Sequence, residues 1–127
     1  MNASTISNDD SILESIKQLL GVMPEQTEFD TDILTFINGC FLDLEQLGVG
    51  PEGGFSIMDK GDIWYDFSDS DKLLSSVKPY IYLKVRLIFD SSSLTSSVIA
   101  SFEKMIERFE WRINMAVELD KKTGEEE

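Results

Sequence analysis

Residues 93–119 read SLTSSVIASFEKMIERFEWRINMAVEL and carry the longest helical pattern in the chain. Apolar residues recur there at spacings of three and four, as on the buried face of an amphipathic helix. That face consists of Val98, Phe102, Met105, Phe109 and Ile113, widened by Leu94, Ile99 and Ile106. Lys104, Arg108 and Arg112 follow one another at intervals of four and form a basic stripe. The stretch predicts a long helix, and residues 120–127 are expected to be a flexible tail.

A second helix is predicted upstream, where residues 30–47 read DTDILTFINGCFLDLEQL. Its apolar stripe consists of Ile33, Ile37, Cys40, Leu44 and Leu47, widened by Leu34 and Phe41. The helix should begin at Asp30 or Thr31 and end before the glycines and the proline of residues 48–51. Phe41, Phe102 and Phe109 are expected in the core. Cys40 is the single cysteine, so no internal disulfide can form, and its apolar neighbours predict a buried, unreactive thiol.

A short first helix should start at a cap formed by Asp9 or Asp10 and run to Leu20, just before Gly21. Its predicted buried face consists of Ile12, Leu13, Ile16, Leu19 and Leu20. Residues 1–8 are polar and are expected to be a second flexible tail.

Residues 71–89 fit two patterns. Residues 80–89 alternate as a strand does, whereas Leu74, Val77, Ile81, Val85 and Ile88 form a helical stripe. Pro79 disfavours the interior of either element. Length favours a helix that is kinked at Pro79 or restarts there, and whether residues 80–89 are one continuous helix stays open.

Residues 51–67 predict a small β-hairpin or an extended loop, because Phe55 and Ile57 alternate with a serine and turn-forming residues follow at 59–62. The segment carries seven large apolar residues, too many for a free loop. Ile63 and Phe67 are expected to cover the core, whereas Phe55, Ile57 and Trp64 are the candidate contact surface for another protein. The predicted fold is therefore mainly α: a single domain over residues 1–127, a bundle of about four helices with this hairpin or loop inserted.

The charge of the chain excludes binding to nucleic acid through neutralised phosphates. The formal net charge is −13, and residues 1–71 contain 15 acidic and two basic residues, whereas the remainder is balanced. Most of the affinity of proteins for nucleic acid comes from basic side chains on phosphates. The acidic excess fits either a soluble surface or one that repels DNA.

No motif predicts a catalytic, metal or cofactor site, and the chain is not expected to be an enzyme. Residues 48–53 match G-x-G-x-x-G, but a helix precedes them and no helix follows, so a helix stop and turn is the better interpretation. Asp66, Asp69 and Asp71 resemble a calcium loop, yet leucines fall at the next ligand positions. This favours a helix cap at Asp69 or Asp71, with a weak ion site as the alternative. The chain has no histidine. Its most apolar run, residues 80–89, is too short for a membrane span, and no secretory signal is expected.

Several phrases resemble the head–tail connector proteins of tailed bacteriophages. They cover most of residues 11–118 and are LGVGP at 47–51, FSI at 55–57, W-x-DF at 64–67, VKPYIYLKVRLIFD at 77–90 and EWRIN at 110–114. Pro79 departs from the pattern and puts the continuity of that helix in doubt.

The resemblance implies a ring of adaptor subunits, typically a dodecamer, in the neck of the virion. Such a ring joins the portal protein of the capsid to a tail-side neck protein and encloses the channel through which DNA leaves, without binding it specifically. The subunits are made in the host cytoplasm, and Phe55, Ile57 and Trp64 would meet a neighbouring subunit or the portal. The alternatives are another neck or tail component, or a monomeric acidic protein that binds a basic partner.

Overall fold

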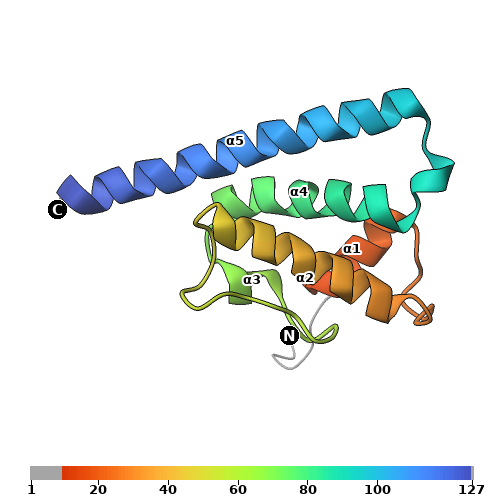
Figure 1. The fold of residues 1–127 in the computed structure, drawn as a ribbon. Coiled ribbons are helices and arrows are strands. Elements are labelled where there is room, and N and C mark those ends of the chain that lie inside the picture. Colours follow the sequence, from red (N-terminus) through yellow and green to blue (C-terminus); the bar gives the residue numbers. More distant parts are fainter. Residues whose placement is uncertain (1–9, 127) are drawn as a thin grey trace.

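The structure, a computed structural model, describes residues 10–126, with side chains described as far as residue 121, and is mainly helical. Its elements are α1 (Ile12–Leu20), α2 (Asp30–Gln46), α3 (Trp64–Phe67), α4 (Asp71–Phe89), a 3₁₀ turn (Ser91–Ser93) and α5 (Ser96–Glu126). Helix α4 lies at the centre, with α5 on one side and α1 and α2 on the other (Figure 1). The predicted mainly α fold is confirmed.

Helix α4 is continuous from Asp71 to Phe89 although it contains Pro79. Proline removes the hydrogen bond to the carbonyl four residues earlier, here that of Ser75. Ser75 is exposed, so water can reach this part of the helix. The helix buries side chains toward both of its neighbouring layers; they are Leu74, Val77, Tyr80, Ile81, Leu83 and Val85. The helical alternative for residues 80–89 is therefore correct, and the doubt raised by Pro79 is resolved in favour of one helix.

The cap of helix α1 lies one residue after Asp10, the later of the two predicted caps. Its cap is Ser11, whose hydroxyl accepts a hydrogen bond of 3.2 Å from the backbone N–H of Glu14, rather than Asp10. Gly21 ends the helix in the left-handed conformation, with φ of 81°, as predicted. The predicted face is confirmed except for Leu19, which is exposed. Asp9 and the predicted tail at residues 1–8 lie outside the described residues.

Helix α5 is longer than predicted and less buried. It continues to Glu126, so the expected flexible tail at 120–127 is wrong as far as residue 126; no glycine or proline interrupts residues 95–123. Of the stripe read from the sequence, Ile113 is buried, Phe102 and Phe109 are half-buried and Met105 is exposed. The reason is that α5 packs mainly on a single helix, α4, and its C-terminal part projects beyond the bundle (Figure 1).

The predicted β-hairpin is absent from residues 51–67. This segment is an extended loop followed by the single turn of α3, and its one β-type pairing is an isolated bridge between Ile63 and Ser11. In that bridge Ile12 donates a backbone hydrogen bond to Asp62, and Trp64 donates one to Asp10. The segment thus pairs with the start of α1, and not with itself.

Candidate interaction surface

The loop of residues 51–63 is fastened to α2 by one asparagine. The side chain of Asn38 accepts a hydrogen bond of 2.8 Å from the backbone N–H of Ile57 and donates one of 3.0 Å to the carbonyl of the same residue. An asparagine amide can pair with both the backbone N–H and the backbone carbonyl of an extended residue, as a neighbouring strand would. Ile57 is therefore directed into the core and is only 3% exposed.

Three phenylalanine rings join this loop to the bundle. The ring of Phe41 lies 4.8 Å from that of Phe55 and 5.0 Å from that of Phe67, between ring centroids, and Phe55 and Phe67 are 5.3 Å apart. Gly50 lies against this cluster with φ of 109°, and a Cβ atom there would come within 2.7 Å of the Phe67 ring. The glycine of the 48–53 motif is thus explained by close packing on Phe67.

Trp64 is part of the core of the subunit. It is 3% exposed, and its indole N–H donates a hydrogen bond of 2.9 Å to the hydroxyl of Ser15 on α1. The Lys78 ammonium lies over the Trp64 ring, 5.4 Å from the ring centroid. Of the predicted contact residues, Ile57 and Trp64 are thus buried in their own subunit and Phe55 is half-buried. The large apolar side chains that this segment leaves exposed are Met58 and Tyr65.

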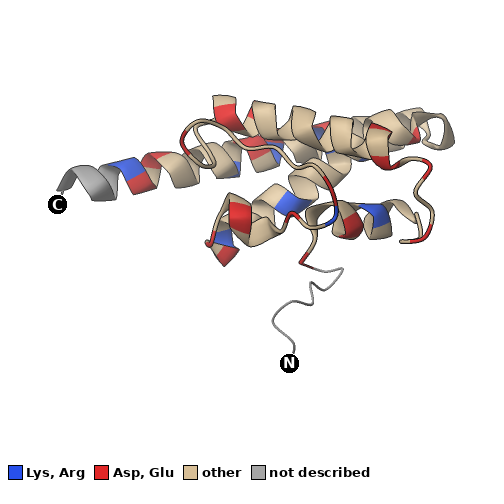
Figure 2. Ribbon diagram, turned by 90° about the horizontal axis from the view of Figure 1, so that it is seen from below, with Lys and Arg blue, Asp and Glu red and all other residues tan. Residues whose placement is uncertain are grey.

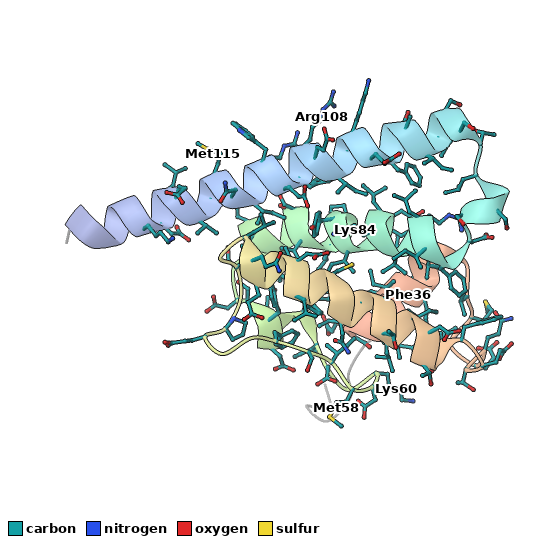
Figure 3. The ribbon with its side chains drawn as sticks, viewed as in Figure 1. Phe36, Met58, Lys60, Lys84, Arg108 and Met115 are labelled. Carbon is teal, nitrogen blue, oxygen red and sulfur yellow. The ribbon has the colours of Figure 1, made fainter. Side chains whose placement is uncertain are left out.

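A larger exposed surface lies on the side of α5 that faces away from α4. Its apolar members are Met105, Trp111, Met115 and Leu119, and Trp111 is 66% exposed. The exposed basic residues Lys104, Arg108 and Arg112 lie on the same side, and Figure 3 shows Arg108 and Met115 directed away from the bundle. We call these seven residues the outer face of α5. The sequence shows it as a second apolar repeat, Trp111–Met115–Leu119, offset from the buried stripe.

An open groove of about 900 Å³ borders the outer face where α5 passes the start of α4. Apolar side chains line it, among them Leu73, Ile113 and Val117, together with the turn at residues 48–50. Charged side chains of both signs complete the lining; these are Asp69, Lys72, Arg112, Asp120 and Lys121. The groove continues the outer face and offers no concentrated set of catalytic groups.

A polar cluster connects α2, α4 and α5 inside the bundle. The Tyr80 hydroxyl donates to the carboxylate of Glu110 at 2.9 Å, and the Lys84 ammonium contacts the Tyr80 oxygen at 3.1 Å and the Asp43 carboxylate. Burial lowers the pKa of Lys84, but its hydrogen bonds to Asp43 and Tyr80 outweigh that effect and raise it overall. Burial raises the pKa of Tyr80, with Glu110 adding to the effect and Lys84 opposing it. These groups stay protonated at neutral pH and hold helices together.

Two of the acidic residues of the calcium-like motif, Asp66 and Asp71, accept local hydrogen bonds. The cap of α4 is Ser70, whose hydroxyl accepts from the N–H of Leu73, and not Asp69 or Asp71 as predicted. Asp71 accepts a hydrogen bond of 2.7 Å from the Tyr65 hydroxyl. Within residues 10–126, no three metal-binding side chains lie together. None of the described helices combines the length and the apolar character that crossing a bilayer requires.

Comparison with known proteins places this arrangement in a family. No curated protein and no solved structure matches the chain significantly. The sequence model of the family described as phage connector protein matches residues 12–120, which span α1 to nearly the end of α5. The resemblance read from the sequence is thereby confirmed, and the chain belongs to the phage connector protein family, whose members are structural proteins of the phage particle that contact other head and tail proteins.

Proposed function

We propose that this chain is a subunit of the ring that joins the capsid portal to the tail and surrounds the channel for DNA. The ring contains several copies, typically twelve as the resemblance implies, and contacts the portal protein on one side and a neck protein on the other. The protein performs no reaction in this role. It positions its partners and leaves the channel open.

The observation that carries this proposal is the charge of the first half of the subunit. Exposed acidic side chains lie on α2 and on the loops at both of its ends; they include Glu25, Glu28, Asp32, Glu45 and Glu52. Acidic positions occur on helices and loops alike (Figure 2). Such a surface repels phosphate, so DNA can pass a wall of this kind without being held. Solubility alone requires no such separation of charge along the chain.

The loop of residues 51–63 and α3 are proposed to contribute to contact with the portal or a neighbour. Phe55, Ile57 and Trp64 support this surface from beneath, because they fix the loop to the core. Met58, which is 83% exposed, and Tyr65, which is 55% exposed, are the apolar side chains of the segment that can reach a partner.

Mass measurement in solution tests the proposal. The purified chain is analysed by light scattering and native mass spectrometry, alone and with the portal protein of the same phage, and the assemblies are imaged by electron microscopy. Closed rings, free or on the portal, are expected, and phage lacking the protein should accumulate heads and tails that do not join. A chain that stays monomeric with and without portal, and that instead captures a basic host protein, would be the acidic regulator.

A further inference from the structure

We propose that the outer face of α5 docks on the exposed side of α2 of a second copy of this chain. This inference rests on the proposed function and names the contact between neighbouring subunits. Its occupant is the acidic face of an identical subunit, and neither the portal nor DNA.

The first argument is the separation of charge around α5. Lys104, Arg108 and Arg112 follow one another at i, i+4 and i+8 on the outer face, and Glu103 and Glu107 repeat at the same interval beside them. Like charges at i, i+4 destabilise an isolated helix, whereas alternating signs would stabilise it. None of these three basic side chains forms an ion pair within 4 Å with another described residue. The pattern therefore suits an external acidic partner better than the helix itself.

The second argument is the apolar content of the same face. Trp111 is 66% and Met115 40% exposed, and they lie among the basic side chains at helical spacing. Tryptophan and arginine are the side chains that most often dominate the energy of protein interfaces. An exposed tryptophan does not make a protein more soluble, so solubility does not explain Trp111. Together with the arginines it gives this face the composition found at the centre of protein interfaces.

The third argument is that the subunit itself carries a complementary face. Helix α2 has no lysine or arginine and exposes Asp32 and Glu45, whereas Asp30 and Asp43 pair with Lys17 and Lys84 of the same subunit. Its exposed side presents Leu42, 61% exposed, one turn from Gly39, where even an added Cβ would meet open space. An exposed leucine between the carboxylates of Asp32 and Glu45 fits the apolar side chains of α5 that lie among guanidinium and ammonium groups.

The positions of the two faces suit repeated association. Helices α2 and α5 lie on opposite sides of α4 (Figure 1), so their exposed sides point in different directions. A contact between two different faces is heterologous, and such contacts generate rings when the rotation closes. Helix α5 has 31 residues and is therefore about 46 Å long, which is enough to reach past its own bundle onto a neighbour.

The test uses charge reversal on the full chain. Arg108→Glu makes the α5 face acidic, and Glu45→Lys makes the α2 face less acidic while placing a cation at a helix C-terminus, where it is tolerated. Each variant alone should raise the dissociation constant of self-association at least tenfold, measured by sedimentation velocity at low salt. An equimolar mixture should recover association, because each altered face then meets its opposite. Trp111→Ala should weaken association to the same degree without lowering the melting temperature.

A matched control separates this contact from net charge. Glu25→Lys makes the same charge change as Glu45→Lys at an exposed position between α1 and α2, outside the proposed contact surfaces, and should leave association unchanged. If rings form as in the wild type with Arg108→Glu and with Trp111→Ala, the docking inference is overturned and the ring function stands. If these variants assemble but lose the portal, the face belongs to the portal instead. If the wild-type chain is monomeric both alone and on the portal, the ring function itself fails.

Discussion

The Tyr80 hydroxyl on α4 donates a hydrogen bond of 2.9 Å to the Glu110 carboxylate on α5. Tyr80 is fully buried, whereas most side chains of α5 are at best half-buried. The bond therefore ties the helix that carries the outer face to a fully buried residue of the core. Through Lys84 the same oxygen is linked to Asp43 on α2, so three helices share one polar cluster.

Replacing Tyr80 by Phe should destabilise the subunit by about 1.5–3 kcal/mol, the range for hydrogen bonds to charged groups. The aromatic ring is kept in this variant, so the loss of stability measures the contribution of the hydroxyl and not that of a cavity. The measurement is urea unfolding followed by circular dichroism. In a double-mutant cycle with Glu110→Ala, the second change should cost much less when Tyr80 is already Phe. Strictly additive effects would show that the two side chains do not interact in solution.

The free energy of unfolding should fall at alkaline pH, because Cys40 and Tyr80 are buried in their protonated forms. Burial raises the pKa of Cys40 from 9.0 to about 12, and it raises that of Tyr80 above its usual value of 10.0. Groups whose pKa is higher in the folded state contribute stability that is complete below the unfolded pKa and is lost as pH rises above it. The free energy of unfolding should thus be constant from pH 7 to about 8.5 and fall between roughly pH 9 and 12. Cys40→Ala should reduce the slope at the lower end of this window. A thiol reagent that modified Cys40 rapidly in the folded protein at pH 8 would contradict its burial.

Trp64→Ala should unfold or strongly destabilise the isolated subunit, by ~3–5 kcal/mol, because it opens a cavity among α1, α3 and α4. Trp64→Phe keeps most of the volume and loses the bond to Ser15, so its cost should be nearer ~1 kcal/mol. Trp111→Phe is the matched control and should change stability by no more than about 0.5 kcal/mol. In Trp111→Phe the remaining fluorescence comes from Trp64 and should be blue-shifted. A Trp64→Ala subunit that melts like the wild type and fails only in assembly would return Trp64 to the interface.

The helices could be predicted from the sequence because each depends on local periodicity. Helix α2 begins at Asp30 as expected and ends within a residue of the prediction. The glycines and the proline that follow it at residues 48–51 are a local signal for the end of a helix. The extent of burial on α5 could not be predicted in this way. A stripe shows which side of a helix is apolar, but Met105 is exposed because α5 packs mainly on α4. The number of elements that cover a helix is a property of the assembled bundle.

The β-hairpin expected at residues 51–67 is wrong for a related reason. Alternating Phe55 and Ile57 do indicate an extended backbone, yet the groups that satisfy that backbone are the amide of Asn38, 19 residues earlier, and residues at the start of α1. Trp64 is likewise bound by Ser15, 49 residues away. Contacts at such separations leave no local signal, so the sequence does not show that Trp64 is buried in its own subunit. The exposed repeat at Trp111, Met115 and Leu119 carries a signal, but it is hidden beside the stronger buried stripe.

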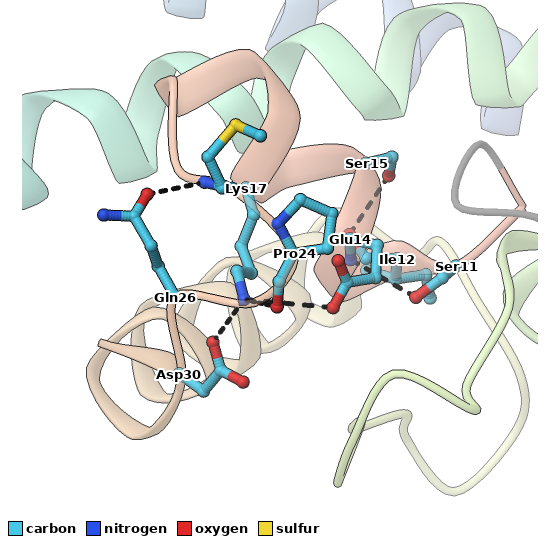
Figure 4. Close-up of polar contacts among 9 residues, drawn as sticks. Ser11, Ile12, Glu14, Ser15, Lys17, Pro24, Gln26 and Asp30 are labelled. Carbon is cyan, nitrogen blue, oxygen red and sulfur yellow. Dashed lines mark hydrogen bonds and ion pairs between the residues drawn. The ribbon is translucent and has the colours of Figure 1, made fainter. Parts of the chain in front are cut away.

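The last prediction concerns Lys17, a charged side chain that the fold encloses. Lys17 is fully buried, its ammonium lies 2.8 Å from a carboxylate oxygen of Asp30, and it donates a hydrogen bond of 3.2 Å to the Pro24 carbonyl (Figure 4). Glu14, 6% exposed, lies 3.9 Å away, and its second oxygen has no hydrogen-bond donor among the described residues. The ammonium thus joins α1, the turn and the start of α2.

Lys17→Met should destabilise the subunit by about 3–5 kcal/mol, because it leaves the buried Glu14 carboxylate without its cation. The double variant Lys17→Met/Glu14→Leu should regain a large part of that loss, since buried ion pairs can be replaced by apolar side chains of similar volume. Lys60→Met, at an exposed loop position, is the control and should stay within about 0.5 kcal/mol of wild type. Urea unfolding of the four proteins measures the effect. If Lys17→Met were as mild as Lys60→Met, the ammonium would be reaching water in solution, and the turn between α1 and α2 would be held by its apolar contacts alone.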